Sequence, residues 1–475
     1  MILERFYNDK LAQASYLVGC PATGEALVID PNRDVAPYLS AADRHEVQIT
    51  HVTETHIHAD FASGLREVAE GSGARALLSD EGGEDWKYAF AGAIDAVLLK
   101  DGDGFNVGNI KVEVLHTPGH TPEHLSFMIT DTAATDRPMG VFTGDFAFVG
   151  AVGRPDLLEK AANIKGTMES SARQLFKSLQ RFKELPDYLQ IWPGHGAGSA
   201  CGKALGAVPQ STLGYERLAS PAFALSDEDE FVRWILDGQP MSPAYFGEMK
   251  RMNKMGPPIL GGLRKPPQTS DAKLRQLALE GAFVVDARPW PDYAAGHIKG
   301  TINIPLGLSF INWAGWFVPY DREFYLILDE ARGEGEVHEA VRDLALIGLD
   351  RVAGYLSTNT AALRGAGSNH LEAIEEVGPE EAHRSLEAGG ATVIDVRAPD
   401  EWAAGHLPGV ANIPLGTVPA RMKEIPTDKP IVLQCRTGER SAIAASLMQA
   451  AGIENVKNLV GGFRRWSSEG YPVER

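Results

Sequence analysis

The stretch Thr55-His56-Ile57-His58-Ala59-Asp60-Phe61, THIHADF, decides the fold of the first half of the chain. It follows VQITHVTET (47–55), which is rich in β-branched residues and predicts a strand that ends at the motif. The spacing matches the metal-site pattern His-x-His-x-Asp-His, except that Phe61 occupies the position of the last His. Since a benzyl group binds no metal, the motif predicts a two-metal site with one ligand missing.

The whole chain is too long for one hydrophobic core. Its 475 residues correspond to roughly three domains. Hydrophobic residues make up 44% of the chain and charged residues 23%, the ordinary balance of a soluble globular protein. The net charge of −18 disfavours nucleic acid and anionic membrane surfaces as partners, because both repel an acidic protein.

Targeting signals and cysteine usage indicate a compartment. The first residues, MILERFYNDKLAQASYLVG, contain no basic segment followed by an apolar run, so we expect no secretory signal. No stretch approaches the roughly 18 apolar residues of a membrane span. Three cysteines, Cys20, Cys201 and Cys435, are too few for a disulfide framework. We therefore expect a cytoplasmic protein with free thiols, of which Cys20, at a strand end, is structural.

Residues 1–255 form the first predicted domain, in which short β-branched runs alternate with helical segments. Strands are predicted at 26–30, 47–55, 110–120, 139–145 and 188–196, and helices at 61–71 and 166–185, the latter capped by Thr167. His or Asp residues follow where the strands end. A layered α/β fold exposes a site at such positions while its strands stay buried.

The second half of the chain contains a duplication. Residues 256–268, GPPILGGLRKPPQ, read as a linker. After it, VVDARPWPDYAAGHIKGTINIPLG (284–307) matches VIDVRAPDEWAAGHLPGVANIPLG (393–416) with a constant offset of 109 residues. A period of this length indicates two related domains rather than a solenoid. We predict small parallel-sheet domains at 268–362 and 375–475, with their boundary near 365–378.

A cysteine loop follows a buried strand in the second copy. Cys435 to Arg440, CRTGER, is a six-residue loop that leads into a helix beginning near Ser441. Backbone N–H groups, the helix N-terminus and the charges of Arg436 and Arg440 all favour a thiolate at Cys435. The same cradle would hold the outer sulfur of a persulfide, Cys–S–S⁻.

The loop and the segment around 393–416 resemble those of rhodaneses. The resemblance implies sulfur transfer, since the related phosphatases use a loop one residue longer. It also implies that Cys435, Arg436 and Arg440 are catalytic, and that Asp395 and Arg397 help to bind substrate. The alternative is a buried inert thiol. In the first copy, FYLILDEARGEGEV (324–337) puts Asp329 where Cys435 sits, so we expect that domain to lack sulfurtransferase activity and to serve packing or positioning.

Four motifs in order resemble the metallo-β-lactamase superfamily. They are THIHAD, TPGHTPEH (117–124), FTGD (142–145) and WPGHG (192–196). The resemblance implies an αββα sandwich over about residues 1–250. Zinc hydrolases of this superfamily hold two metals, which the Asp of the TGD motif bridges.

Phe61 removes one ligand of the second metal. A single metal held by His56, His120 and Asp145 then keeps open positions, which suits non-haem Fe(II). Within the superfamily, the motifs therefore most resemble those of the persulfide dioxygenases. These enzymes usually keep the last His, so Phe61 is a departure from their pattern. The resemblance implies one Fe(II) per chain, with zinc as a possible substitute. His58 and Asp60 are expected to orient the ligands, with His58 as a ligand the alternative. His195 is either a hydrogen-bonding wall residue or a relic of the second site.

Two further residues bear on the substrate. In persulfide dioxygenases a segment like VGRPD (152–156) lines the pocket, so Arg154 could pair with a carboxylate or with the persulfide anion; an ordinary surface arginine is the alternative. Cys201 lies six residues after His195 in a glycine-rich loop. A thiol there could receive or relay sulfur, and it could equally be inert.

The domain order resembles the persulfide dioxygenase–rhodanese fusions of bacterial sulfide detoxification. The implied reactants are a low-molecular-weight thiol persulfide and O₂, with sulfite as product and thiosulfate formed at Cys435. We expect a homo-oligomer, dimer or tetramer. One rival is a zinc hydrolase of thioesters or lactams with accessory rhodanese domains. Another is a sulfur-carrier or redox-sensing module.

Overall fold

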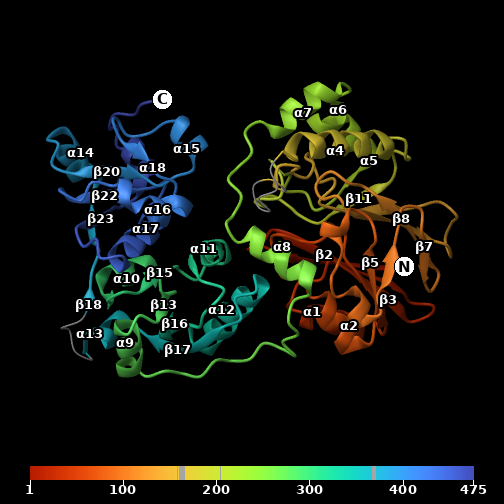
Figure 1. The fold of residues 1–475 in the computed structure, drawn as a ribbon, viewed down its shortest axis with the longest axis horizontal. Helices are drawn as coiled ribbons and strands as arrows, with labels where there is room; N and C mark the ends of the chain where they lie inside the picture. The colour runs from red at the N-terminus through yellow and green to blue at the C-terminus, as the bar shows by residue number, and fades with distance from the viewer. Residues whose placement is uncertain (158, 160–165, 204, 366–370) are drawn as a thin grey trace. The chain divides into compact units, whose positions relative to one another are not determined.

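The computed structural model describes residues 1–157, 159, 166–203, 205–365 and 371–475 (Figure 1). Their contacts form two compact units, the first of residues 1–263 with 345–348 and the second of residues 264–344 with 349–475. The three domain ranges given above remain predictions. The boundary predicted near 365–378 includes residues 366–370, which lie outside the described residues. Within the described part, no helix is long and apolar enough to cross a membrane.

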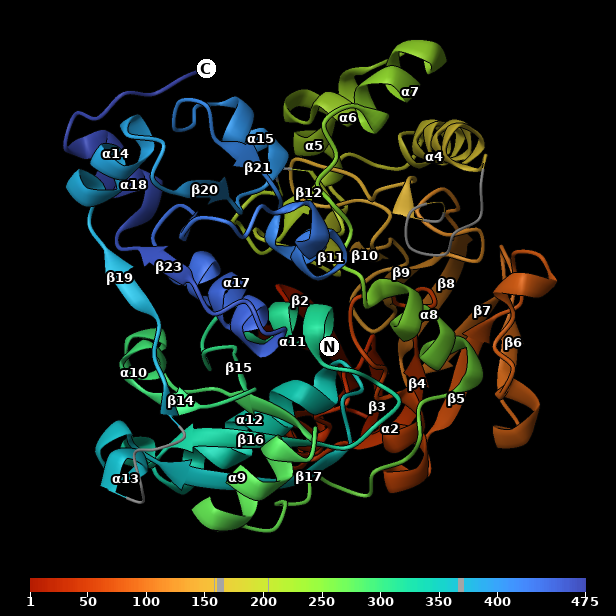
Figure 2. The same cartoon turned by 60° about the vertical axis from the view of Figure 1, so that its left-hand side comes forward.

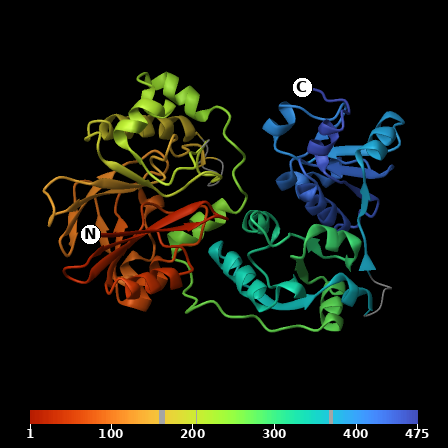
Figure 3. The same ribbon diagram turned by 180° about the vertical axis from the view of Figure 1, so that it is seen from behind.

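Two six-stranded sheets form the centre of the first unit, counted over its described residues. The first contains β1 (Ile2–Asn8), β2 (Gln13–Cys20), β3 (Glu25–Ile29), β4 (Gln48–Thr53), β5 (Arg75–Ser79) and β6 (Val97–Leu99) in that order. The second has the order β12 (Ser211–Thr212), β11 (Gln190–Pro193), β10 (Gly140–Gly144), β9 (Leu125–Asp131), β8 (Ile110–His116) and β7 (Gly104–Val107). Figure 3 shows these strands from behind.

Alternating side chains pack the two sheets together. In β8, Ile110, Val112 and Val114 are buried while Lys111 is exposed, the period of two that a half-buried strand requires. The buried side chains join Leu27 of the first sheet and others in one hydrophobic cluster. The sheet faces at this cluster therefore form the inner layer of the sandwich.

Helices cover the outer faces of both sheets (Figure 1). Buried residues of α1 (Ala36–Arg44) and α2 (Leu65–Ser72) pack on the first sheet, and those of α4 (Met168–Phe182) pack on the second. Among the described residues of this unit, further α-helices are α5 (Leu213–Ala219), α6 (Pro221–Ala224), α7 (Glu228–Leu236) and α8 (Phe246–Met255). This layer order confirms the predicted αββα sandwich.

Two details of these helices differ from the sequence prediction. The helix predicted at 61–71 begins only at Leu65, because Gly64 N–H donates to Pro31 O and the preceding residues form a turn. Thr167 occupies the N-cap position of α4, but its side chain makes no capping hydrogen bond. The first difference arises from a tertiary contact, which local propensity does not contain.

The second unit contains two parallel sheets, as predicted (Figure 2). The strand orders are β15 (Ile302–Asn303), β13 (Phe283–Asp286), β16 (Phe324–Asp329), β17 (Val352–Thr358), and β19 (Glu375–Val377), β23 (Val456–Leu459), β22 (Ile431–Gln434), β20 (Thr392–Asp395), β21 (Ala411–Asn412). A short ladder joins β14 (His297–Ile298) to β18 (Leu371–Glu372). The helices are α9 (Asp271–Leu279), α10 (Trp290–Ala295), α11 (Phe310–Phe317), α12 (Glu334–Leu346), α13 (Thr360–Gly365), α14 (Pro379–Glu387), α15 (Pro399–Ala403), α16 (Val418–Arg421), α17 (Glu439–Ala450) and α18 (Gly462–Ser468).

The register of these sheets corrects one prediction. Asp395 of β20 pairs with Gln434, and the equivalent Asp286 of β13 pairs with Ile327. The residue that corresponds to Cys435 is therefore Leu328, so the placement of Asp329 there is wrong by one position. The offset between the copies is 109 residues for β13 and β20, and 107 residues for β16 and β22. The sequence match did not reveal this change of offset. Leu328 carries no nucleophile, so the reason for expecting an inactive first copy stands.

Candidate metal centre and cysteine loop

Three polar side chains converge where strands of both sheets end. His56 follows β4, His120 follows β8 and Asp145 follows β10, and all three are buried. Their ligand atoms lie within 4.8 Å of one another. Nε2 of His56 is 3.9 Å and Nε2 of His120 is 3.6 Å from Oδ2 of Asp145. Neither oxygen of Asp145 makes a hydrogen bond within the described residues, so the carboxylate is free to bind a cation.

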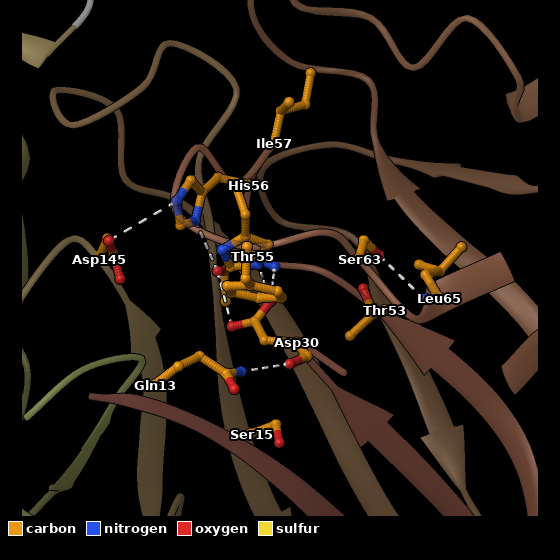
Figure 4. Close-up of polar contacts among 12 residues, drawn as sticks. Gln13, Ser15, Asp30, Thr53, Thr55, His56, Ile57, Ser63, Leu65 and Asp145 are labelled. Atoms are coloured by element: carbon orange, nitrogen blue, oxygen red, sulfur yellow. Dashed lines mark hydrogen bonds and ion pairs between the residues drawn. The ribbon is translucent and has the colours of Figure 1, made fainter. Parts of the chain in front are cut away.

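A hydrogen-bonded chain fixes the tautomer of His56 (Figure 4). Thr55 Oγ1 donates its proton to Oδ2 of Asp30 at 2.9 Å and lies 3.0 Å from Nδ1 of His56. Because the hydroxyl proton is used on Asp30, Nδ1 of His56 must be the donor to Thr55. The lone pair of His56 is then on Nε2, the atom that faces Asp145.

His120 and His124 have their rings fixed in the same way. Nδ1 of His120 is 3.1 Å from the carbonyl oxygen of Arg154, so it donates there and leaves Nε2 for a metal. His124 Nδ1 is 2.9 Å from Thr117 Oγ1, and its Nε2 accepts from the backbone N–H of Asp145 at 3.2 Å. His124 therefore helps to hold Asp145 in place.

The electrostatics of the three residues fit a divalent cation. Burial, and then the neighbouring histidines, lower the pKa of His56 well below its usual value. Burial also lowers the pKa of His120, against the opposing charge of Asp145. Both rings are therefore neutral, the form that binds metal. Burial raises the pKa of Asp145, and a bound cation would oppose that shift.

His58 is not part of this group of ligand atoms and is hydrogen-bonded to Asp30 instead. Its Nε2 donates to Oδ1 of Asp30 at 3.0 Å, and its ring lies 4.3 Å from the ring of Phe61. Burial lowers the pKa of His58, but the charge and hydrogen bond of Asp30 outweigh this and raise it to about 9. Phe61 itself is fully buried, so hydrocarbon fills the position of the missing ligand.

A second buried group lies beside the first. The ligand atoms of Asp60, His195 and Cys201 are within 4.8 Å of one another. His195 Nε2 is 3.1 Å from Oδ2 of Asp60 and 3.4 Å from Oδ1 of Asp145. Burial, and then the charges of Asp60 and Asp145, raise the pKa of the Cys201 thiol to about 12. The residues that the sequence assigned to separate roles therefore surround one point next to Asp145.

Arg154 is fully buried, so the alternative of an ordinary surface arginine is wrong. Its guanidinium pairs with both oxygens of Asp156, at 3.0 and 2.8 Å, and donates to the carbonyl oxygens of Ala200 and Pro240. Arg154 therefore ties its own segment to the backbone at Ala200 and Pro240. The predicted contact between Arg154 and substrate would require some of these hydrogen bonds to break, and it remains a prediction.

In the second unit, the loop of Cys435 forms a cradle around the sulfur. Cys435 is buried, and its Sγ accepts from the N–H of Gly438 at 3.1 Å and lies 3.4 Å from Ser441 Oγ. Gly438 has φ of +106°, which favours glycine, and the helix α17 begins at the next residue. Arg436 is exposed at this loop. The geometry suits a sulfur that carries negative charge.

The other charged residues around the loop are paired. Asp395 and Arg397 form a buried bidentate pair, with contacts of 2.6 to 3.0 Å. Arg440 forms a half-buried bidentate pair with Glu401, at 2.6 and 2.9 Å. Glu401 was not predicted, since its partner lies 39 residues away. The substrate contacts predicted for Asp395 and Arg397, and the catalytic role predicted for Arg440, remain predictions. The two ion pairs fix these side chains next to the Cys435 loop.

Comparison with known proteins places this fold in a family. The family model "Metallo-beta-lactamase superfamily" matches residues 8–195, and "Rhodanese-like domain" matches residues 270–347 and 378–469. A crystal structure described as a metallo-beta-lactamase from Staphylococcus aureus subsp. aureus COL is 44% identical, with a TM-score of 0.67. The match covers 75% of this chain and 99% of that one. The chain belongs to the metallo-beta-lactamase superfamily. The predicted order of one such domain followed by two rhodanese-like domains is confirmed.

Two curated relatives are less similar to this chain. A hydroxyacylglutathione hydrolase of Rhodopseudomonas palustris is 30% identical over 240 residues, which cover 50% of this chain and 80% of the relative. A beta-lactamase hydrolase-like protein of Xylella fastidiosa is 26% identical over 58% of this chain, and the chain covers 65% of its length. Neither similarity identifies the reaction, which is argued from the site.

Proposed function

We propose that this protein is a non-haem iron persulfide dioxygenase joined to a sulfurtransferase, which oxidises low-molecular-weight persulfides to sulfite and forms thiosulfate in sulfide detoxification. The observation that carries the proposal is the donor set itself. Two neutral imidazoles and one carboxylate converge at one point, while the buried ring of Phe61 occupies a further ligand position. A two-His, one-carboxylate set with open positions suits Fe(II) that must bind both O₂ and substrate.

The chain's own residues have defined tasks in this proposal. His56, His120 and Asp145 would hold Fe(II), which when bound supplies the activation of O₂ next to the persulfide sulfur. Thr55 and the carbonyl of Arg154 keep the two imidazoles in the tautomer that binds metal. Burial of all three ligands excludes bulk water from the reacting atoms.

Cys435 would transfer the outer sulfur of the same persulfide to sulfite. Its thiolate attacks the outer sulfur of R–S–SH, the inner sulfur leaves as the thiol R–SH, and Cys435 becomes the persulfide. Sulfite then attacks that outer sulfur, thiosulfate leaves and the thiolate is restored. The N–H of Gly438 already donates to Sγ and would stabilise the charge on sulfur in both steps.

A zinc-dependent thioester or lactam hydrolase is the second candidate, because a hydroxyacylglutathione hydrolase is 30% identical to half of the chain. Against it stands Phe61, since a two-metal hydrolase of this motif uses a histidine at that position. Anaerobic loading with Fe(II) or Zn(II) separates the candidates. We expect the iron form to consume O₂ with glutathione or coenzyme A persulfide and to release sulfite. Thioester hydrolysis by the zinc form, with no O₂ uptake by the iron form, would overturn the proposal.

Replacement of the rhodanese cysteine tests the second step. We expect full-length Cys435→Ser to release sulfite from the iron site but to form no thiosulfate, because an alcohol cannot carry sulfane sulfur. Cys20→Ser is the matched control, since Cys20 is a buried thiol at the end of β2. Thiosulfate formation at the wild-type rate by Cys435→Ser would exclude this residue as the sulfur carrier.

A further inference from the structure

The first rhodanese-like copy has a cavity at the carboxyl ends of its strands. The cavity has a volume of about 480 Å³, and its lining includes residues 289–291 after β13, 305–309 after β15 and Arg332 after β16. β13 is parallel to both of the other strands. Open α/β sheets bind ligands beyond the carboxyl ends of their strands, and a cavity of this size is typical of a small-molecule site. This copy therefore has room for a ligand, although Leu328 supplies no nucleophile.

The cavity adjoins the loop of Cys435. Its lining includes Glu439, the first residue of α17, and Ser309 Oγ donates to Oε1 of Glu439 at 2.8 Å. The N–H of the preceding residue, Gly438, donates to Cys435 Sγ at 3.1 Å, so Cα of Glu439 lies within about 9 Å of the sulfur. α17 also packs against β15 (Figure 2). The cavity of the first copy thus borders the cysteine loop of the second.

Arg332 supplies a positive charge at this cavity. Its Nη atoms lie 3.4 Å from Oε1 of Glu336 and 3.2 Å from Oε2 of Glu339. These contacts are long, and 45% of the Arg332 side chain is exposed, so the guanidinium is available to an anion. A phosphate or a carboxylate has the geometry that a guanidinium binds best.

The rest of the lining suits an apolar body that carries amide groups. Trp290 is half-buried, and together with the exposed Leu308 it offers a surface on which an apolar or aromatic group can pack. The carboxylate of Glu439 repels anions from its side of the cavity and can accept hydrogen bonds from amide N–H groups. The matching ligand has an anionic end, an apolar or aromatic part and amides between them.

We propose that this cavity binds the carrier portion of a thiol persulfide, an amide-containing thiol with a phosphate or carboxylate group, and thereby guides its outer sulfur to Cys435. Coenzyme A and glutathione both have this chemistry. A thiol as long as a tripeptide spans about 10 Å, which is enough to reach from the cavity to the cysteine loop. The inference deepens the proposed function and rests on its sulfurtransferase step. It gives the first copy a binding role beyond packing or positioning.

The rate at which Cys435 of the full-length protein gains sulfur, followed by peptide mass spectrometry, tests this inference. The donors are coenzyme A persulfide, glutathione persulfide and thiosulfate, which has no carrier portion. For Trp290→Ala and Arg332→Gln we expect the half-saturating concentration of at least one carrier persulfide to rise roughly tenfold at an unchanged maximal rate, because only ground-state binding is lost. Uptake from thiosulfate should stay at the wild-type rate. The carrier whose constant rises identifies the ligand.

Trp313→Ala and Arg342→Gln are the matched controls from the same unit. Trp313 of α11 stacks on the ring of Phe317, and Arg342 of α12 pairs with Asp343. Neither side chain lines the cavity. Both controls should therefore react with all three donors as the wild type does.

Calorimetric titration of the full-length protein with reduced coenzyme A and with glutathione separates the inference from the proposed function, because it needs no sulfur transfer. We expect at least one thiol to bind, and Arg332→Gln to weaken its binding roughly tenfold. This variant also keeps the test valid if Trp290→Ala does not fold.

Several outcomes would overturn the inference even where Cys435 takes up sulfur. One is that neither thiol binds the wild type, and another is that Trp290→Ala and Arg332→Gln bind and react as the wild type does. An equal loss with thiosulfate would assign these residues a structural role and would also overturn it. If Cys435 takes up no sulfur from any donor, the sulfurtransferase step fails, while thiol binding that weakens in Arg332→Gln still locates the carrier in this cavity.

Discussion

Asp30 is a buried carboxylate at the end of β3 that organises both histidines of the THIHADF motif. It accepts from the N–H of Thr55 at 2.6 Å, from the hydroxyl of Thr55 at 2.9 Å and from Nε2 of His58 at 3.0 Å. The chain from Asp30 through Thr55 ends at Nδ1 of His56. One residue outside the motif therefore sets the orientation of a predicted metal ligand.

Thr55→Val tests this chain. Valine has the shape of threonine but cannot accept from Nδ1 of His56, so the imidazole loses the partner that fixes its tautomer. We expect the affinity of the first site for a divalent metal to fall about 10- to 100-fold, measured by competition with a chromophoric chelator.

Thr53→Val is the matched control, because Thr53 is a buried threonine of β4 whose hydroxyl donates to Leu77 O at 2.8 Å. Its loss should lower the free energy of unfolding by about 1 kcal/mol and leave metal affinity unchanged. Equal metal affinity in the two variants would show that the hydroxyl of Thr55 has no part in ligand orientation.

At this scale the sequence predicted the convergence of His56, His120 and Asp145, because each lies in a motif just after a strand. It did not predict Asp30 or His124 as positioning residues. Asp30 acts 25 residues along the chain from Thr55, and His124 acts 21 residues from Asp145. Such contacts depend on how strands pair, which motif spacing does not contain.

The start of α18 packs directly against the cysteine loop. The N–H of Phe463 donates to Cys435 O at 2.7 Å, and the N–H of Arg464 donates to Arg436 O at 3.0 Å. Gly462 has φ of +53°, and a Cβ there would lie 2.2 Å from Cys435 O. The loop can therefore keep its shape only if this position is glycine.

Gly462→Ala is expected to displace the loop of Cys435. The left-handed backbone costs about 1–2 kcal/mol for alanine, and the contact with Cys435 O adds to it. We predict a loss of sulfurtransferase activity of at least about tenfold together with a lower melting temperature, because the cradle around Sγ moves.

Gly470→Ala separates strain from contact, since Gly470 has φ of +82° with no atom within 4 Å of its Cβ position. It should lose about 1–2 kcal/mol of stability with sulfurtransferase activity retained. If both variants were equally active, close packing at Gly462 would not matter for the loop.

At the scale of elements, the sequence predicted the parallel sheets but misplaced one residue within them. The hydrophobic run around Leu328 fits either register, because a buried parallel strand is apolar on both faces. Only the pairing of Asp286 with Ile327 resolves it. Periodicity alone cannot distinguish positions in such a strand.

The whole molecule divides into two compact units, and the predicted metal residues all belong to the first. Each unit has its own hydrophobic clusters, so each is expected to unfold in its own transition. A ligand that binds one folded unit stabilises that unit alone. Metal loading should therefore act on one of two calorimetric transitions.

Differential scanning calorimetry of the full chain, with and without metal, measures this. Metal at about 100 times its Kd adds about 2.7 kcal/mol, which corresponds to roughly 5–10 °C in the transition of the first unit. His56→Gln should abolish that shift, because it removes a ligand. His406→Gln should keep it, since His406 belongs to the second unit, where it donates to Trp402 O at 3.0 Å and stacks on the Trp402 ring. A single transition that rises as a whole on metal addition would mean that the two units unfold together.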